Sequence, residues 1–131
     1  MRRVLVTGGA GYIGSHTCLE LLNAGFEITV IDNLSNSTEE SLQRVSTLTG
    51  KEISFFQVDL LDIESLNSVF SKGRFDTVIH FAALKAVGES VLQPLRYYQN
   101  NVTGAVNLCQ AMQEHDVTDL VFSSSATVYG V

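Results

Sequence analysis

The sequence contains no tryptophan, one proline and two cysteines in 131 residues. Cys18 and Cys109 form neither a CxxC motif nor a metal-ligand spacing, which argues against a disulfide scaffold and a zinc module. Both lie in helical patterns, so we interpret them as buried, reduced thiols. The apolar run after Met1-Arg2-Arg3 is too short for a secretory signal, and we expect a cytoplasmic protein without a bound metal.

Basic residues and long apolar segments are also scarce. The chain contains eight Lys and Arg residues and 14 Asp and Glu residues, so the formal net charge is −6. Nucleic acids and anionic membranes require a basic stripe, and we expect neither as a partner. No segment approaches the roughly 20 apolar residues of a membrane span. The hydrophobic fraction of 45% suits one core, which predicts a single domain over residues 1–131.

Glycine, in contrast, is concentrated near the N-terminus. The apolar run Val4–Thr7 is followed by four glycines within seven positions: Gly8, Gly9, Gly11 and Gly14. A helical pattern comes next, with Cys18, Leu21 and Leu22 on one face and Gly25 at its end. Glycines between a strand and a helix let backbone N–H groups approach a pyrophosphate at the helix N-terminus. This order of elements predicts a dinucleotide-binding turn.

An acidic residue stands where such a site needs one. Residues 27–31 are typical of a second buried strand, which ends at Asp32, 18 positions beyond Gly14. A carboxylate about 20 residues after the glycines hydrogen-bonds the adenosine ribose in dinucleotide-binding folds. The alternative is that Asp32 caps a helix. No Lys or Arg that could hold a 2′-phosphate follows before Arg44, so we expect NAD rather than NADP.

The rest of the chain alternates between helical and strand patterns. A capping box, Ser37-x-x-Glu40, predicts a helix that ends at Gly50 and buries Leu42, Val45 and Leu48. Residues 53–58 form the third predicted strand, which ends in Asp59. Asp62 then caps a helix that ends at Gly73 and buries Leu66, Val69 and Phe70.

A fourth strand and its exit are predicted over residues 77–83. Pro94 argues against a long helix over residues 86–98. A helix is predicted from Asn101 to about Glu114, and helical spacing assigns its buried face to Val102, Ala105, Val106 and Cys109. Residues 120–125 complete the pattern as a fifth strand.

These elements predict an α/β fold of the Rossmann type. Continuous apolar strands alternating with helices indicate a doubly wound parallel sheet in the order 3-2-1-4-5, within a three-layer αβα sandwich. The ligand crevice should lie between strands 1 and 4, at their carboxyl ends, where the strand order reverses. We expect the sheet to be truncated after strand 5. An unpaired strand edge can pair with another chain, so we expect self-association, with a homodimer as one form of it.

Several polar residues end strands at this edge or follow them. Lys85 could reach a phosphate or a ribose hydroxyl, although a solvated loop lysine would have the same sequence signature. The hydroxyls of residues 123–125 could bind a substrate alcohol or merely form a turn. Asn100 could be an N-cap of the following helix. We interpret His16 and His80 as structural histidines.

The glycine turn Thr7–Gly14 resembles that of the extended short-chain dehydrogenase/reductase family. Three further segments are similar to the nucleotide-sugar epimerases of that family: residues 80–90, 97–104 and 122–130. The run from Lys85 to Ser90 is the most specific part. Related dehydratases carry an Asp-Glu pair where this chain has Ser125-Ala126, which argues against dehydration.

The resemblance implies interconversion of UDP-glucose and UDP-galactose through a 4-keto sugar with bound NAD, in galactose metabolism. It places Gly8, Gly11, Gly14, Tyr12 and Ile13 at the pyrophosphate. Around the adenosine ribose it places Asp32, Asn33, Leu34, Ser35, Asn36 and Ser37, and at the adenine Asp59 and Leu60. The remaining cofactor contacts are Phe81, Ala82, Ala83, Leu84, Lys85 and Asn100. Ser125 is implied to hold the sugar of a UDP-hexose substrate.

One feature of the family is missing. Its catalytic base belongs to a Tyr-x-x-x-Lys motif beyond strand 5, and Tyr129 is followed only by Gly130 and Val131. We therefore assign no catalytic residue, expect the C-terminal nucleotide-sugar domain to be absent, and expect no epimerisation by this chain alone. The alternatives are a non-catalytic NAD-binding module, another extended-family nucleotide-sugar epimerase, and a structural fragment that binds no nucleotide.

Overall fold

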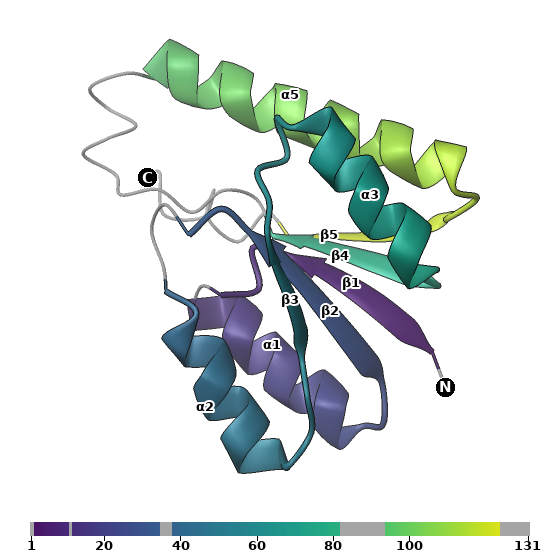
Figure 1. Ribbon diagram of the computed structural model, residues 1–131. Coiled ribbons are helices and arrows are strands. Elements are labelled where there is room, and N and C mark those ends of the chain that lie inside the picture. The colour runs from purple at the N-terminus through teal and green to yellow at the C-terminus, as the bar shows by residue number, and fades with distance from the viewer. Residues whose placement is uncertain (1, 11, 35–37, 82–93, 124–131) are drawn as a thin grey trace.

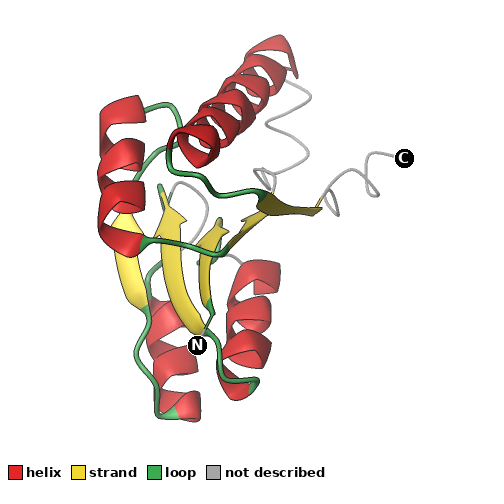
Figure 2. Cartoon of the chain, turned by 90° about the vertical axis from the view of Figure 1, so that its right-hand side faces the viewer, coloured by secondary structure: helices red, strands yellow, loops and turns green. Residues whose placement is uncertain are grey.

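A five-stranded parallel sheet lies between two layers of helices (Figures 1 and 2). The computed structural model describes residues 2–10, 12–34, 38–81 and 94–123. The strands are β1 (Arg3–Thr7), β2 (Glu27–Asp32), β3 (Ser54–Gln57), β4 (Thr77–Phe81) and β5 (Asp119–Ser123). The helices are α1 (Tyr12–Asn23), α2 (Glu40–Thr49), α3 (Ile63–Gly73) and α5 (Pro94–Glu114). The sheet order β3-β2-β1-β4-β5 confirms the predicted doubly wound topology.

Side chains alternate between the two faces of the sheet, and each face has its own apolar core. Val4 and Val6 of β1 join a cluster with Cys18 and Leu22 of α1 and with residues of α2. Leu5, between them, faces the cluster built by α3 and α5. Figure 1 shows α1 and α2 on one side of the sheet and α3 and α5 on the other. The period-two alternation of a strand therefore assigns each apolar residue to one helical layer.

The predicted ends of α1, α2 and α3 are largely confirmed. At the end of α1 the N–H of Phe26 donates to Leu21 O and that of Gly25 to Leu22 O, while Gly25 has φ +96°. Gly50 adopts a left-handed conformation after α2. The Asp62 carboxylate accepts from Ser65 N and caps α3. The left-handed residue after α3 is Arg74 rather than Gly73. Gly73 instead gives room to Phe75, whose ring would lie 2.1 Å from a Cβ at that position.

The predicted start of α5 is wrong. This helix begins at Pro94, whereas the sequence pattern placed its start at Asn101. Proline is well tolerated as the first residue of a helix, because the N–H group that it lacks has no helical partner there. Asn100 therefore lies within the helix and is not its N-cap.

The predicted buried face of α5 is also wrong. Val102 and Val106 are 46% and 57% exposed, and Cys109 is exposed as well. The face that packs on the sheet is Gly104, Asn107, Leu108, Ala111 and Met112. Both sets have helical spacing, so periodicity alone could not choose between them. Of the two cysteines only Cys18 is a buried thiol, and burial raises its pKa to about 12.

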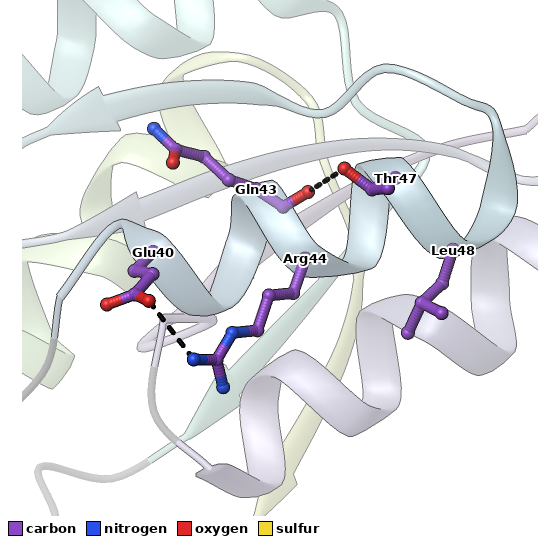
Figure 3. A pocket seen from close by; sticks show the side chains of 5 residues that line it. All are labelled: Glu40, Gln43, Arg44, Thr47 and Leu48. Atoms are coloured by element: carbon purple, nitrogen blue, oxygen red, sulfur yellow. Dashed lines mark hydrogen bonds and ion pairs between the residues drawn. The ribbon is translucent and has the colours of Figure 1, made fainter.

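Two details of α2 differ from the prediction. The helix begins at Glu40, and its N-cap Glu39 makes no side-chain capping bond, so Glu40 is not the third helical residue that a capping box requires. Ser37 lies outside the described residues. Leu48 is 75% exposed, and Figure 3 shows its side chain on the same side of α2 as that of the ion-paired Arg44. Leu42 and Val45 are buried as expected.

Within residues 2–10, 12–34, 38–81 and 94–123, no helix is both long and apolar enough to cross a bilayer.

The burial pattern predicts unequal effects of two identical substitutions. Leu66→Ala, at a side chain with no exposed surface, should lower the free energy of unfolding by about 2–5 kcal/mol. Leu48→Ala should change it by no more than about 0.5 kcal/mol, because that side chain already contacts water. Urea denaturation followed by circular dichroism measures both. A large loss for Leu48→Ala would contradict the exposed position of that residue.

Candidate functional site

The glycine turn is built by backbone groups in very close contact. The N–H of Gly8 donates to Ile31 O at 2.9 Å, and Gly8 has φ +76°. A Cβ on Gly14 would lie 2.4 Å from Gly8 O, and one on Gly9 would lie 2.8 Å from Val30 Cγ1. Since a backbone oxygen cannot move aside as a flexible side chain can, only glycine fits at position 14. The start of α1 is thereby packed directly against the end of β1.

Asp32 connects this turn to the end of β2. Its Oδ2 accepts from Ala10 N at 3.1 Å, and its Oδ1 accepts from Leu34 N at 2.8 Å. The second bond spans two residues and supports the left-handed backbone of Leu34, with φ +60°. The interpretation of Asp32 as a helix cap is wrong, because α2 begins only at Glu40. The half-buried carboxylate instead lies at the edge of the glycine turn.

The exit of β3 comes next to that of β2. Val58 N donates to Asp32 O at 3.2 Å, which places the following residue, Asp59, close to the end of β2. Asp59 is exposed and accepts from Leu61 N at 2.9 Å. Leu60 O accepts from the Asn107 side chain of α5 at 2.9 Å. Asp32, Asp59 and Leu60 are therefore gathered at one edge of the sheet, as the sequence predicted.

A buried polar pair occupies the end of β1 and β4, where the strand order reverses. Thr7 and His80 are opposite each other in the β1–β4 register, and the Thr7 hydroxyl is hydrogen-bonded to His80 Nδ1. The His80 ring lies 5.2 Å from the Phe122 ring, between centroids. Burial lowers the pKa of His80 below its usual value, so the ring is held in its neutral form. The burial of His80 and its bond to Thr7 agree with its interpretation as a structural histidine.

The structure describes only part of the predicted set. Gly8, Ile13, Gly14, Asp32, Asn33, Leu34, Asp59, Leu60 and Phe81 lie within the described residues. Those outside them are Gly11, Ser35, Asn36, Ser37, Ala82, Ala83, Leu84, Lys85 and Ser125. For Tyr12 and Asn100 the backbone is described: Tyr12 is the first residue of α1, and Asn100 lies inside α5.

Sequence reasoning missed two residues that hold loops at this edge of the sheet in place. Ser41, in the first turn of α2, donates its hydroxyl to Ala10 O at 2.7 Å. Asn107 of α5 holds the Leu60 carbonyl. Neither has a sequence signal, because a serine near a helix start and an asparagine within a helix are ordinary. A shallow surface pocket on α2 includes neither Ser41 nor Asn107 (Figure 3). Its lining residues are Glu40, Gln43, Arg44, Thr47 and Leu48.

A doubly wound sheet with a glycine turn at the carboxyl end of β1 and a carboxylate at that of β2 defines a dinucleotide-binding class of domain. Comparison with known families makes the assignment specific. The NAD dependent epimerase/dehydratase family matches residues 4–131, and the chain belongs to this family.

Curated relatives and solved structures agree with this assignment. The chain is 63% identical to UDP-glucose 4-epimerase of Bacillus subtilis over 128 residues, which are 98% of this chain and 38% of that protein. It is 58% identical to the UDP-glucose 4-epimerase uge1 of Schizosaccharomyces pombe, covering 97% of this chain and 36% of that protein. The predicted resemblance to nucleotide-sugar epimerases is confirmed, and the chain spans about 38% of the length of such relatives.

Two crystal structures have the same fold over nearly the whole chain. UDP-glucose 4-epimerase of Stenotrophomonas maltophila, with bound NAD and formylated UDP-arabinopyranose, has a TM-score of 0.90 at 46% identity. That of Bifidobacterium longum, in complex with NAD+ and UDP, has a TM-score of 0.90 at 48% identity. Each match covers 98% of this chain and 38% of the other.

The burial of His80 predicts a pH dependence of stability. The lowered pKa means that the folded chain resists a proton that the unfolded chain accepts below about pH 6.5. The contribution of His80 to the free energy of unfolding is therefore fully present above about pH 6.5, and it decreases as the pH falls through that value. His80→Asn keeps a polar atom near the position of Nδ1 and cannot ionise. When the pH is lowered from about 7.5 to about 5.5, the free energy of unfolding should decrease in both proteins. The decrease in the His80→Asn variant should be smaller than that in the wild type by up to about 1.4 kcal/mol.

Urea denaturation at the two pH values measures this difference, and comparison at pH 7.5 gives the cost of the substitution itself. Equal losses in the two proteins would show that another group causes the pH dependence.

Proposed function

We propose that this chain is the cofactor-binding part of a UDP-glucose 4-epimerase and that it holds NAD at the glycine turn. One observation carries the proposal. The turn is joined to Asp32 by the hydrogen bond to Ala10 N, within a chain 63% identical to the B. subtilis enzyme. The NAD-bound relatives with TM-scores of 0.90 support the same cofactor.

The described residues fit NAD on chemical grounds. The close backbone packing at Gly8 and Gly14 excludes side chains from the turn, which suits the approach of a pyrophosphate to backbone N–H groups. Tyr12 and Ile13 begin α1, so their N–H groups are at the positive end of that helix. Asp32 would accept from the adenosine ribose, and its negative charge disfavours a 2′-phosphate.

The other proposed contacts follow the order of the strand ends. Asn33 and Leu34, with Ser35, Asn36 and Ser37, would complete the surroundings of the ribose, and Asp59 and Leu60 those of the adenine. Phe81 to Lys85 and Asn100 would line the rest of the cofactor. Ser125 would hold the sugar of a UDP-hexose.

The reaction would take place at C4 of the hexose. When bound, NAD would supply a reversible hydride acceptor for C4 of the hexose. The described residues of this chain would bind and orient the cofactor for that exchange. A cytoplasmic role in galactose metabolism belongs to the same proposal.

Calorimetric titration with NAD and NADP tests the cofactor assignment. The chain should bind NAD more tightly than NADP. Asp32→Ala should weaken NAD binding by roughly 10- to 150-fold, because a hydrogen bond to a charged group contributes about 1.5–3 kcal/mol. Asp76→Ala is the matched control: its carboxylate also accepts from a backbone N–H, that of Arg3, but at the opposite end of the sheet.

The control should keep the affinity of the wild type. Preference for NADP, or no binding by a chain shown to be folded, would overturn the proposal. Equal weakening by both substitutions would show that Asp32 acts through general stability and not at the ribose.

A further inference from the structure

The peptide groups on either side of Ala10, in the middle of the glycine turn, are held from two directions. The N–H of Ala10 donates to Asp32 Oδ2 at 3.1 Å, and its carbonyl accepts from the Ser41 hydroxyl at 2.7 Å. The Ala10 side chain is only 2% exposed. The end of β2 and the first turn of α2 thus fix one residue of the turn between them.

These two bonds restrict how the turn can present its other backbone groups. The Ala10 N–H points to Asp32 and is occupied there, so the pyrophosphate must be met by other N–H groups of the turn and of α1. Each peptide group is planar, so holding Ala10 at its N–H and at its carbonyl limits rotation of both adjoining peptides. A turn that is ordered before ligand arrives avoids an entropy cost on binding.

Ser41 is well placed to hold the glycine turn through the Ala10 carbonyl. It is the second residue of α2, which lies beside α1 beneath the sheet in Figure 1. Its side chain is half-buried. Its hydroxyl also lies 3.1 Å from the carbonyl oxygen of Thr38, three residues earlier in the chain. The bond to Ala10 O is the shorter of the two, and it crosses from α2 to the glycine turn.

We propose that Ser41 is a positioning residue of the NAD site: it fixes the glycine turn through the Ala10 carbonyl and thereby raises affinity for the cofactor. This inference rests on the proposed function, because it assumes that the turn binds NAD. Ser41 acts through Ala10, and nothing in its role requires contact with the cofactor.

Three variants isolate the hydroxyl. Ser41→Ala removes it, and Ser41→Thr keeps it with one added methyl group. Thr47→Ala is the matched control, because the Thr47 hydroxyl donates at 3.0 Å to the Gln43 carbonyl of the same helix (Figure 3). Among the residues that the structure describes, it bonds no other element. Calorimetric NAD titration measures affinity, urea denaturation measures stability, and hydrogen–deuterium exchange reports the mobility of the turn.

We expect Ser41→Ala to bind NAD about 3- to 10-fold more weakly, which is the effect of losing one neutral hydrogen bond. Ser41→Thr should bind within about twofold of the wild type, and Thr47→Ala should be unchanged. A small loss of global stability cannot produce the same result, because a chain stable by several kcal/mol stays almost entirely folded. Amide exchange in residues 8–14 should be faster in Ser41→Ala alone.

NAD affinity of Ser41→Ala within twofold of the wild type would overturn the inference while leaving the proposed function intact. So would unchanged exchange in the turn, whether or not NAD binds. Absence of NAD binding by the folded wild type would instead refute the proposed function, and the exchange experiment would then decide whether Ser41 orders the turn.

Discussion

The close contact between Gly14 and the Gly8–Gly9 backbone is the constraint on which the rest of the site depends. Because a Cβ at position 14 would lie 2.4 Å from Gly8 O, α1 can begin this near to β1 only with glycine there. The close approach brings the N-terminus of α1 to the carboxyl edge of the sheet, where β2 and β3 also end. The same contact therefore positions the helix N-terminus and brings it to Asp32.

Asp32 has two roles that are separable in principle. In the structure its carboxylate accepts from Ala10 N and Leu34 N and so holds two loops together. In the proposed site it would also accept from ribose. A residue at this position is therefore constrained by the fold as well as by the ligand, since a neutral side chain without two acceptor oxygens would release one of the loops.

The sequence predicted the sheet order and placed Gly14 and Asp32 at one edge of the sheet, because both follow from the alternation of elements and from the positions of these residues. It failed where two faces of one helix are equally apolar. Val102 and Val106 have the same spacing as Leu108 and Met112, and the choice between them is made by tertiary packing, where Gly104 allows α5 to approach Leu60. Leu48 was misplaced for a different reason: it comes six residues after Leu42, and at 3.6 residues per turn it lies about 120° around α2 from that buried side chain. Ser41 could not be found at all, because its partner is a backbone carbonyl far away in the sequence.

This last failure has a physical basis that applies to cofactor turns in general. Backbone groups carry no sequence signal, yet a glycine-rich turn has little besides its backbone with which to bind or to be held. Glycine permits the close contacts but also adds flexibility, so other elements must restore the lost order. Here Ile31 O holds Gly8 N, Asp32 holds Ala10 N, and Ser41 holds Ala10 O. The rigidity that the turn needs is thus supplied by the end of β2 and by α2, and not by the glycine motif itself.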